Sequence, residues 1–226
     1  MSTMELTVAN GIHILTLTNG DNENKLNLDV INEYHKHVDT VAAYEGNTAF
    51  VLICDHEKTF STGIDLEWLM GDGVEHAGEF VAQLENLMLR VGLLDMPTII
   101  GLNGNCYAGG AIFATAFDFK FMRSDRGRFC YPEVNINIPF TDVMSAIIQL
   151  NPNKQVLKEM ALIGTAFTGE ECLKHQIVDY IFSQNELRAK VLEFAQAMAG
   201  KDRKTFGNIK SGLRPSLVAF KQQRKL

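Results

Sequence analysis

Apolar and polar positions along the first 140 residues predict strands and helices in alternation. Residues 6–18 alternate around Asn10-Gly11, a dipeptide typical of tight turns, and so predict a β-hairpin. From Asp29 to about Tyr44 the apolar residues recur at helical spacing, which predicts a helix with one buried face. That face comprises Val30, Ile31, Tyr34, Val38 and Val41. Residues 49–54 form a continuous apolar run, the pattern of a strand buried on both faces.

The alternation continues to about residue 140 and then stops. Residues 79–93 predict an amphipathic helix that ends near Gly92, residues 98–102 a strand, and residues 111–117 an apolar helix. Residues 119–122 and 128–131 predict two further strands. From Thr141 onward the pattern is helical alone, with a break at Asn151-Pro152-Asn153, a helix start at residues 168–171 and a long helix over residues 186–199. We therefore expect an α/β protein with a helical C-terminal region that folds as one unit.

Composition and charge narrow the class of protein. The 226 residues are 46% hydrophobic and 21% charged, as in ordinary globular proteins. The net charge of −6 lacks the basic excess that nucleic-acid binding needs, so we expect no nucleic-acid partner. The first residues carry no signal-peptide pattern and no apolar run is long enough to span a bilayer, which predicts a cytoplasmic protein without membrane contact. The ending Arg224-Lys225-Leu226 resembles a peroxisomal address, and a peroxisomal location is the alternative.

The metal-binding residue types show no ligand pattern. The four cysteines, at positions 54, 106, 130 and 172, are widely spaced, which favours reduced and buried thiols. The six histidines also lack ligand spacing, so we expect no metal site.

Two segments have a pattern from which a catalytic or binding site can be built. Thr62-Gly63-Ile64-Asp65 and Ala108-Gly109-Gly110-Ala111 each follow a predicted strand, turn at glycine and open a helix. The first N–H groups of a helix have no partner within the helix, so two such groups that converge would form an oxyanion hole for a carbonyl oxygen. The alternative is structural: glycine serves only close packing, and Asp65 only caps the following helix.

Five short motifs follow one another along the chain. They are Asn24-Lys25-Leu26-Asn27, the segment 60–66 (FSTGIDL), the segment 103–118 with its glycine pair, the segment 131–139 with Pro132-Glu133, and Thr168–Glu171 followed by Ile177-Val178-Asp179. In this order they resemble the N-x-L-N, F-S-A-G-x-D-L, N-G-x-x-x-G-G, P-E-x-x-x-G-x-x-P and T-x-x-E-A…G-L-V-D elements of the enoyl-CoA hydratase/isomerase (crotonase) superfamily. The resemblance covers roughly residues 5–185, and the shared order makes it far more specific than any single motif.

The resemblance implies a fold, a ligand and an assembly. The implied fold is the crotonase (ClpP-like) spiral of ββα units over residues 1–140, which carries the CoA and oxyanion sites. The helical C-terminal region, residues 141–226, is implied to assemble homotrimers or dimers of trimers. The implied ligand is an acyl-CoA thioester whose carbonyl oxygen lies between the backbone N–H groups of Ile64 and Gly109. Because coenzyme A belongs to this substrate, no separate cofactor is expected.

The resemblance also implies which residues contact coenzyme A. These are Lys25, Leu26, Ser61 and Gly63, with Asp65 and Leu66 beside them in the first glycine loop.

The acid–base residues indicate the reaction within the family. Family hydratases use two glutamates, but the position of the first is Ile112 here, and only the second is present, as Glu133. A single carboxyl group in an apolar pocket can move one proton from C2 to C4, which is what a Δ3,Δ2-enoyl-CoA isomerase of fatty-acid metabolism requires. Asn137 stands where the family has glycine, and asparagine tolerates the left-handed backbone that such a turn needs.

Two other functions fit the same residues. One is a different one-carboxylate reaction, such as acyl-CoA hydrolysis, decarboxylation or weak hydration, in which Glu133 positions water or a carboxylate. The other is a non-catalytic member of the family that binds acyl-CoA.

Overall fold

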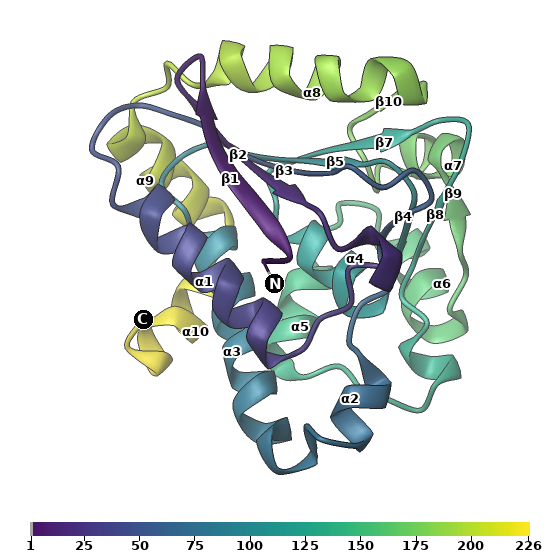
Figure 1. The fold of residues 1–226 in the computed structure, drawn as a ribbon. Helices are drawn as coiled ribbons and strands as arrows, with labels where there is room; N and C mark the ends of the chain where they lie inside the picture. Colours follow the sequence, from purple (N-terminus) through teal and green to yellow (C-terminus); the bar gives the residue numbers. More distant parts are fainter. Residues whose placement is uncertain (1) are drawn as a thin grey trace.

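The structure, a computed structural model, describes residues 2–226, whose strands form two sheets (Figure 1). The larger sheet has the order β1-β2-β3-β5-β7-β10, and the smaller has the order β4-β6-β8-β9. The strands of the larger sheet are β1 (Met4–Ala9), β2 (Ile12–Leu17), β3 (Phe50–Cys54), β5 (Thr98–Leu102), β7 (Phe119–Arg123) and β10 (Tyr180–Phe182). Those of the smaller sheet are β4 (Thr59–Ser61), β6 (Asn105–Tyr107), β8 (Arg128–Cys130) and β9 (Phe167–Thr168). The predicted α/β class is confirmed.

Helices cover both faces of the larger sheet. α8 (Gln184–Met198) lies across one face, where Leu187 and Val191 pack against Val51 and Ile53 of β3 (Figure 1). α1 (Leu28–Ala42), α3 (Ala77–Gly92) and α4 (Ala108–Thr115) belong to the core on the other side. Because successive side chains of a strand point to opposite faces, β3 is buried along its whole length, as its apolar run predicts.

The N-terminal hairpin and the first helix follow the sequence pattern closely. Asn10 and Gly11 join β1 to β2 with φ angles of 50° and 77°, the positive values that a two-residue type I′ turn requires. α1 buries the five apolar residues of the predicted face. It begins one residue before Asp29, because Asn27 caps it by accepting a hydrogen bond from the Val30 N–H at 3.0 Å.

The smaller sheet places three loops at one edge. β4, β6 and β8 are parallel, so their carboxyl ends lie on the same side of the sheet. β4 leads into the first glycine loop, β6 into the second, and β8 into Pro132-Glu133. Segments that are far apart in the sequence thereby meet, and the edge at which parallel strands end is the usual place for a ligand site in an α/β protein.

The C-terminal region contains strands as well as helices. The expectation of helices alone after residue 140 is wrong at two points, because β9 pairs antiparallel with β8 and β10 pairs parallel with β7. The helices of this region besides α8 are α5 (Asp142–Ile148), α6 (Lys154–Ile163), α7 (Gly169–Lys174), α9 (Arg203–Leu213) and α10 (Pro215–Arg224). Thr168 and Glu171 start α7 with a reciprocal capping box, as predicted.

Buried ion pairs fasten the last two helices to the core. Asp118, the residue directly before β7, pairs with Lys210 of α9 at 2.6 Å and with Arg214, the residue before α10, at 2.9 Å. Lys210 also donates a hydrogen bond to the Met96 carbonyl, and Arg214 donates to the Ala116 carbonyl. Within residues 2–226 no helix is both long and apolar enough to cross a membrane.

Candidate active site

The three loops surround a cavity of about 240 Å³. The side chains and backbone that line it come from the first loop and the start of α2 (Leu66–Met70), from the second loop and the start of α4, and from the turn after β8. The lining residues are Thr62, Ile64, Leu66, Tyr107, Ala108, Gly109, Pro132, Glu133, Ile136 and Ile138. The structure thus brings together all three residues to which the sequence assigned catalysis, namely Ile64, Gly109 and Glu133.

The Ile64 amide is turned away from its neighbouring segment. Leu26 and Ile64 form a parallel β-bridge, in which the Leu26 N–H donates to the Gly63 carbonyl at 2.8 Å and the Asp65 N–H donates to the Leu26 carbonyl at 2.9 Å. In such a bridge the flanking residues supply the hydrogen bonds, so the Ile64 N–H points to the opposite side. Within residues 2–226 it has no hydrogen-bond acceptor.

The Gly109 amide lies next to the first loop. Gly109 is the second residue of α4, and its N–H likewise has no acceptor among the described residues. A Cβ built on Gly109 would lie 3.6 Å from the Ile64 nitrogen, and one built on Gly63 would lie 2.7 Å from the Gly109 nitrogen. The two loops therefore touch through their backbones, and two free N–H groups border one cavity. This arrangement can hold a carbonyl oxygen that gains negative charge.

The backbone at the second loop is strained. Ala108 has a φ of 50°, a left-handed conformation that residues with a Cβ seldom adopt and that costs about 1 kcal/mol or more. This conformation turns the chain from β6 into α4 and brings the free end of α4 to the cavity. Strain of this kind is maintained only where the surrounding structure fixes it, and it is common at functional sites.

Glu133 contributes a buried carboxyl group to the cavity. It begins a short 3-10 turn after Pro132, and only 5% of its surface is exposed. Burial raises the pKa of the carboxyl group to about 7, with only its own backbone N–H acting in the opposite direction. Its Oε2 atom has no hydrogen-bond partner among the described residues. A carboxyl group with a pKa near neutrality can both take and return a proton at physiological pH.

The turn that follows Glu133 fixes its position. The Glu133 carbonyl accepts hydrogen bonds from the Ile136 and Ile138 N–H groups at 3.2 and 3.1 Å. Asn137 lies between them with a φ of 57°, so the prediction that asparagine supports a left-handed turn here is confirmed. Ile136 and Ile138 then add an apolar wall to the cavity.

The residues implied to contact coenzyme A lie in and beside the first loop. Leu66 lines the cavity, Leu26 is buried, and Lys25 is partly exposed next to it. The Ser61 hydroxyl is buried, donates to the Asn24 carbonyl at 2.9 Å and accepts from the Gly63 N–H at 3.1 Å, so its side chain shapes the loop from within. The role of these residues in CoA binding stays a prediction.

The side chain of Asp65 caps the helix that follows it, which the sequence analysis gave as the alternative to a functional role. It accepts a hydrogen bond from the Trp68 N–H at 3.2 Å and so caps α2. Its CoA contact, too, stays a prediction.

The position at which family hydratases carry their first glutamate is occupied here by a buried apolar side chain. Ile112 lies on α4, three residues after Gly109, and is 1% exposed within the apolar core. Glu133 is therefore the only acidic side chain among the described residues that line the cavity. Sequence reasoning missed Thr62, whose side chain has a buried hydroxyl at the cavity wall, although its place between a strand and a glycine could have drawn attention to it.

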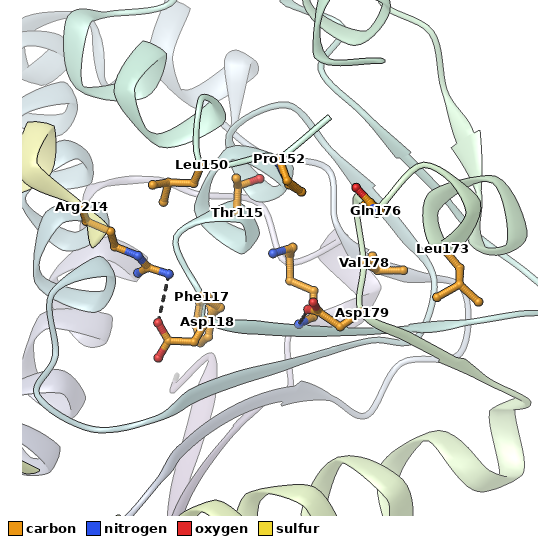
Figure 2. A pocket seen from close by; sticks show the side chains of 11 residues that line it. Thr115, Phe117, Asp118, Leu150, Pro152, Leu173, Gln176, Val178, Asp179 and Arg214 are labelled. Carbon is orange, nitrogen blue, oxygen red and sulfur yellow. Dashed lines mark hydrogen bonds and ion pairs between the residues drawn. The ribbon is translucent and has the colours of Figure 1, made fainter. Parts of the chain in front are cut away.

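A larger cavity of about 550 Å³ lies at the other end of α4 (Figure 2). The Asp118–Arg214 ion pair forms one side, and Gln176 and Asp179 lie across from it. Its buried charges hold α9 and α10 to the core, and its backbone provides no glycine loop at a helix start. We therefore place the candidate active site in the smaller cavity. In the part of the chain that the structure describes, no group of three His, Cys, Asp or Glu side chains could hold a metal ion.

Comparisons with known proteins agree with this geometry. The sequence model of a family described as enoyl-CoA hydratase/isomerase matches residues 7–225. Enoyl-CoA delta isomerase 3 of Arabidopsis thaliana is 31% identical over 172 residues, which cover 74% of this chain and 72% of the relative. The peroxisomal enoyl-CoA delta isomerase 2 of the same plant is 28% identical over 214 residues, which cover 91% and 88%.

Solved structures share the fold. An apo structure of an enoyl-CoA isomerase from Mycobacterium tuberculosis has a TM-score of 0.88 to this chain at 19% identity, covering 96% of this chain and 93% of the other. The crotonase fold that the sequence motifs imply is therefore confirmed.

Proposed function

The chain belongs to the enoyl-CoA hydratase/isomerase family, and from this premise we propose that it is a Δ3,Δ2-enoyl-CoA isomerase. The observation that carries the proposal is the single carboxyl group of the cavity, Glu133, with a pKa of about 7. Hydration needs one group to activate water and a second to deliver a proton, whereas isomerisation needs one group that takes a proton and gives it back. The isomerase names of two relatives support the same choice.

The proposed reaction uses the two backbone amides and the carboxylate in sequence. The thioester oxygen of a 3-enoyl-CoA accepts hydrogen bonds from the Ile64 and Gly109 N–H groups, which makes the C2 protons more acidic. The Glu133 carboxylate takes a proton from C2, and the electron pair moves into the conjugated dienolate. The dienolate then takes this proton from Glu133 at C4, which leaves the double bond between C2 and C3 and restores the carboxylate.

The apolar wall supports isomerisation over hydration. Leu66, Ile136 and Ile138 face the space in which the dienolate would form. An apolar wall offers no second acid–base group to activate a water molecule against C3. It also keeps the proton on Glu133 until it is returned, because exchange with bulk water is slower in a buried site.

An ultraviolet assay with purified protein tests the reaction. With 3-hexenoyl-CoA we expect growth of the absorbance of the conjugated 2-enoyl thioester. Parallel assays would follow loss of that absorbance from 2-hexenoyl-CoA and release of free CoA thiol. Isomerisation with little of either other signal supports the proposal. Thiol release alone would favour the hydrolase, rapid loss of 2-enoyl-CoA a hydratase, and silence in all three the non-catalytic acyl-CoA-binding protein.

Substitution of Glu133 tests the proton shuttle. Glu133→Gln keeps the size of the side chain but removes the base, so we expect turnover to fall by about 10³-fold or more while acyl-CoA binding persists. Glu75→Gln, at an exposed position, is the matched control and should leave turnover unchanged. Turnover that survives in Glu133→Gln would show that another group moves the proton.

A further inference from the structure

The larger cavity, of about 550 Å³, is lined by segments that lie far apart in the sequence (Figure 2). They are the junction of α4 and β7, the turn between α5 and α6, the segment 173–179 at and after the end of α7, and Arg214 between α9 and α10. Small-molecule pockets typically measure about 300–1,000 Å³, so this cavity is large enough for a ligand. Among the described residues it shares no lining residue with the active-site cavity, so a ligand here would occupy a second site.

Lys120 is a partly buried lysine that lines this cavity. Within residues 2–226 no carboxylate oxygen lies within 4.0 Å of its Nζ atom, and that atom makes no hydrogen bond. Asp179 instead accepts a hydrogen bond from the Lys120 backbone N–H at 2.7 Å. Burial lowers the pKa of Lys120, the Asp179 charge opposes this effect, and the Arg214 charge adds to it. A desolvated cation without an anion in contact is costly, so the cavity favours an anionic ligand.

The neighbouring Asp118 carboxylate is fully used by the fold. Its Oδ2 atom accepts hydrogen bonds from the Thr98 N–H and hydroxyl at 2.9 and 3.0 Å and also pairs with Lys210. Its Oδ1 atom pairs with Arg214. Arg214 donates both Nη1 hydrogens to backbone carbonyl groups, so its Nε hydrogen and one Nη2 hydrogen have no acceptor among the described residues. These two donors and the Lys120 ammonium are therefore available to a ligand.

The charges at and beside the cavity wall match an anion with a single charge. Among the described residues the cations are Lys120, Arg214 and Lys210, and the carboxylates are Asp118 and Asp179. One positive charge is left over, which a carboxylate balances. A doubly charged phosphate would instead place excess negative charge beside the two aspartates.

Gln176 lines the cavity from a strained backbone position. Its φ of 62° is a left-handed conformation, which glycine adopts far more readily than a residue with a Cβ. The residue follows the end of α7, where glycine is the usual choice. Its side-chain amide can donate to a carboxylate, and a side chain kept at a strained position is typical of a functional site.

The rest of the lining is largely apolar. Leu150 and Pro152 come from the turn between α5 and α6, and Leu173 and Val178 come from the end of α7 and the segment after it (Figure 2). Leu173 is 40% exposed, an unusual exposure for a large apolar side chain unless something covers it. These walls suit the short hydrocarbon chain of an organic acid.

We propose that this cavity binds a small monocarboxylic acid with a short apolar chain. The Lys120 ammonium and the two free Arg214 donors bind the carboxylate, Gln176 donates to it, and the chain packs against the apolar walls. The proposal goes beyond the isomerase function and does not depend on it, because the two cavities share no lining residue among those described.

Isothermal titration calorimetry with hexanoate tests the class of ligand. We expect one hexanoate to bind per chain. Hexanamide has the same chain without the charge and should bind about tenfold more weakly or worse, because hydrogen bonds to a charged group are the stronger ones. Inorganic phosphate, which lacks the chain, should also bind more weakly.

Substitution of Lys120 tests the anion site. Lys120→Met keeps the length of the side chain and removes the ammonium, so we expect hexanoate affinity to fall about tenfold or more. The Tm of the unliganded protein should stay the same or rise, because a desolvated charge is removed. Lys158→Met, at an exposed position on α6, is the matched control and should keep the wild-type affinity. Gln176→Gly relieves the backbone strain and should fold normally but bind hexanoate more weakly.

Methyl NMR shows which cavity hexanoate occupies. We expect the signals of Leu173 and Val178 to shift on titration and that of Ile138, in the active-site cavity, to stay in place. Shifts confined to Ile138, wild-type affinity in folded Lys120→Met, or equal binding of hexanamide would each overturn the proposal. Absence of hexanoate binding would overturn it as well and would leave a second copy of the chain as the group that covers Leu173.

Discussion

Burial of Glu133 lowers the stability of the fold at neutral and alkaline pH. Its carboxyl group has a pKa of about 7 in the fold, compared with an ordinary value of 4.5, because burial disfavours the charged form. The folded protein therefore binds the Glu133 proton more tightly than the unfolded chain does. The stability that this group contributes is complete below about pH 4.5 and is lost as the pH rises through about 7.

This linkage predicts that Glu133→Gln is more stable than the wild type at alkaline pH. Glutamine carries no charge, so it avoids a burial penalty of about 3 kcal/mol, the free-energy equivalent of the pKa difference. Urea unfolding of both proteins at pH 8.5 and pH 5 measures this effect, and we expect a gain for the variant at pH 8.5 that shrinks towards zero at pH 5. An equal difference at the two pH values would mean that the glutamine acts through packing and not through charge.

At the residue scale the sequence was informative wherever a motif specifies a backbone shape. The order of the motifs identified Ile64, Gly109 and Glu133, and the structure brings these three to one cavity. Asn137 was predicted to support a left-handed turn because it stands where the family has glycine and asparagine tolerates that conformation, and its φ of 57° agrees. The unpaired Thr62 hydroxyl could not be predicted, because its environment depends on residues up to 76 positions away, such as Ile138.

At the element scale the site depends on the contact between two loops. Gly63, after β4, has a φ of 87°, and a Cβ at this position would lie 2.7 Å from the Gly109 nitrogen and 2.9 Å from the Ala108 Cβ. The first loop and the start of α4 can therefore approach each other only if residue 63 has no side chain.

This contact predicts that Gly63→Ala damages catalysis more than stability alone explains. The added methyl group pushes the Gly109 amide away from the cavity, so we expect kcat to fall by about 10²–10³-fold, the usual effect of losing one oxyanion donor. Gly78→Ala, in the first turn of α3, meets no atom within 4 Å and is the matched control. A Gly63→Ala protein that stays folded and keeps the wild-type kcat would exclude the Gly109 amide from the oxyanion site.

Element prediction from sequence was reliable for long elements and poor for short ones. α1, β3 and β5 were predicted within two residues of their bounds. The helical spacing of apolar residues repeats over several turns in α1, and each of the two strands is a run of five residues that is long enough to recognise. β6, β9 and β10 have three residues or fewer, too few to show any period, and their strand state comes from pairing with neighbours. α9 and α10 were also not foreseen as separate helices, because charged residues rather than an apolar stripe fasten much of their inner face.

At the scale of the whole molecule, one carboxylate joins the core to the C-terminal helices. Asp118 is 10% exposed and is shared by Lys210 and Arg214, which are 4% and 11% exposed. Figure 2 shows the pair with Arg214. Desolvation lowers the pKa of Lys210 to about 8, and the adjacent Asp118 charge opposes that effect. Loss of the shared carboxylate would leave two buried cations without their counter-charge.

We therefore expect Asp118→Asn to destabilise the protein by about 3–5 kcal/mol, as loss of one partner from a buried ion pair usually does. Asp125→Asn, which removes an exposed carboxylate that pairs with Arg123, should cost about 1 kcal/mol or less. Thermal unfolding of the two variants measures the contrast. Neither residue lines the active-site cavity. Equal destabilisation by the two substitutions would show that the two pairs are energetically alike and that the C-terminal helices do not depend on Asp118.

The outer face of α9 predicts that the chain assembles with copies of itself. Ile209 and Leu213 are 60% and 76% exposed one turn apart on this helix, beside a cavity of about 290 Å³ that they line together with Phe206. Large apolar side chains clustered on one exposed face are typical of interfaces. The sequence resemblance implies a homotrimer or a dimer of trimers, so sedimentation should give about three or about six times the chain mass of 25.2 kDa. Ile209→Ser with Leu213→Ser should dissociate the assembly, whereas Leu162→Ser, at an equally exposed position on α6, should not. Dissociation by Leu162→Ser alone would move the interface to α6, and a monomeric wild type would mean that the apolar face of α9 has another partner.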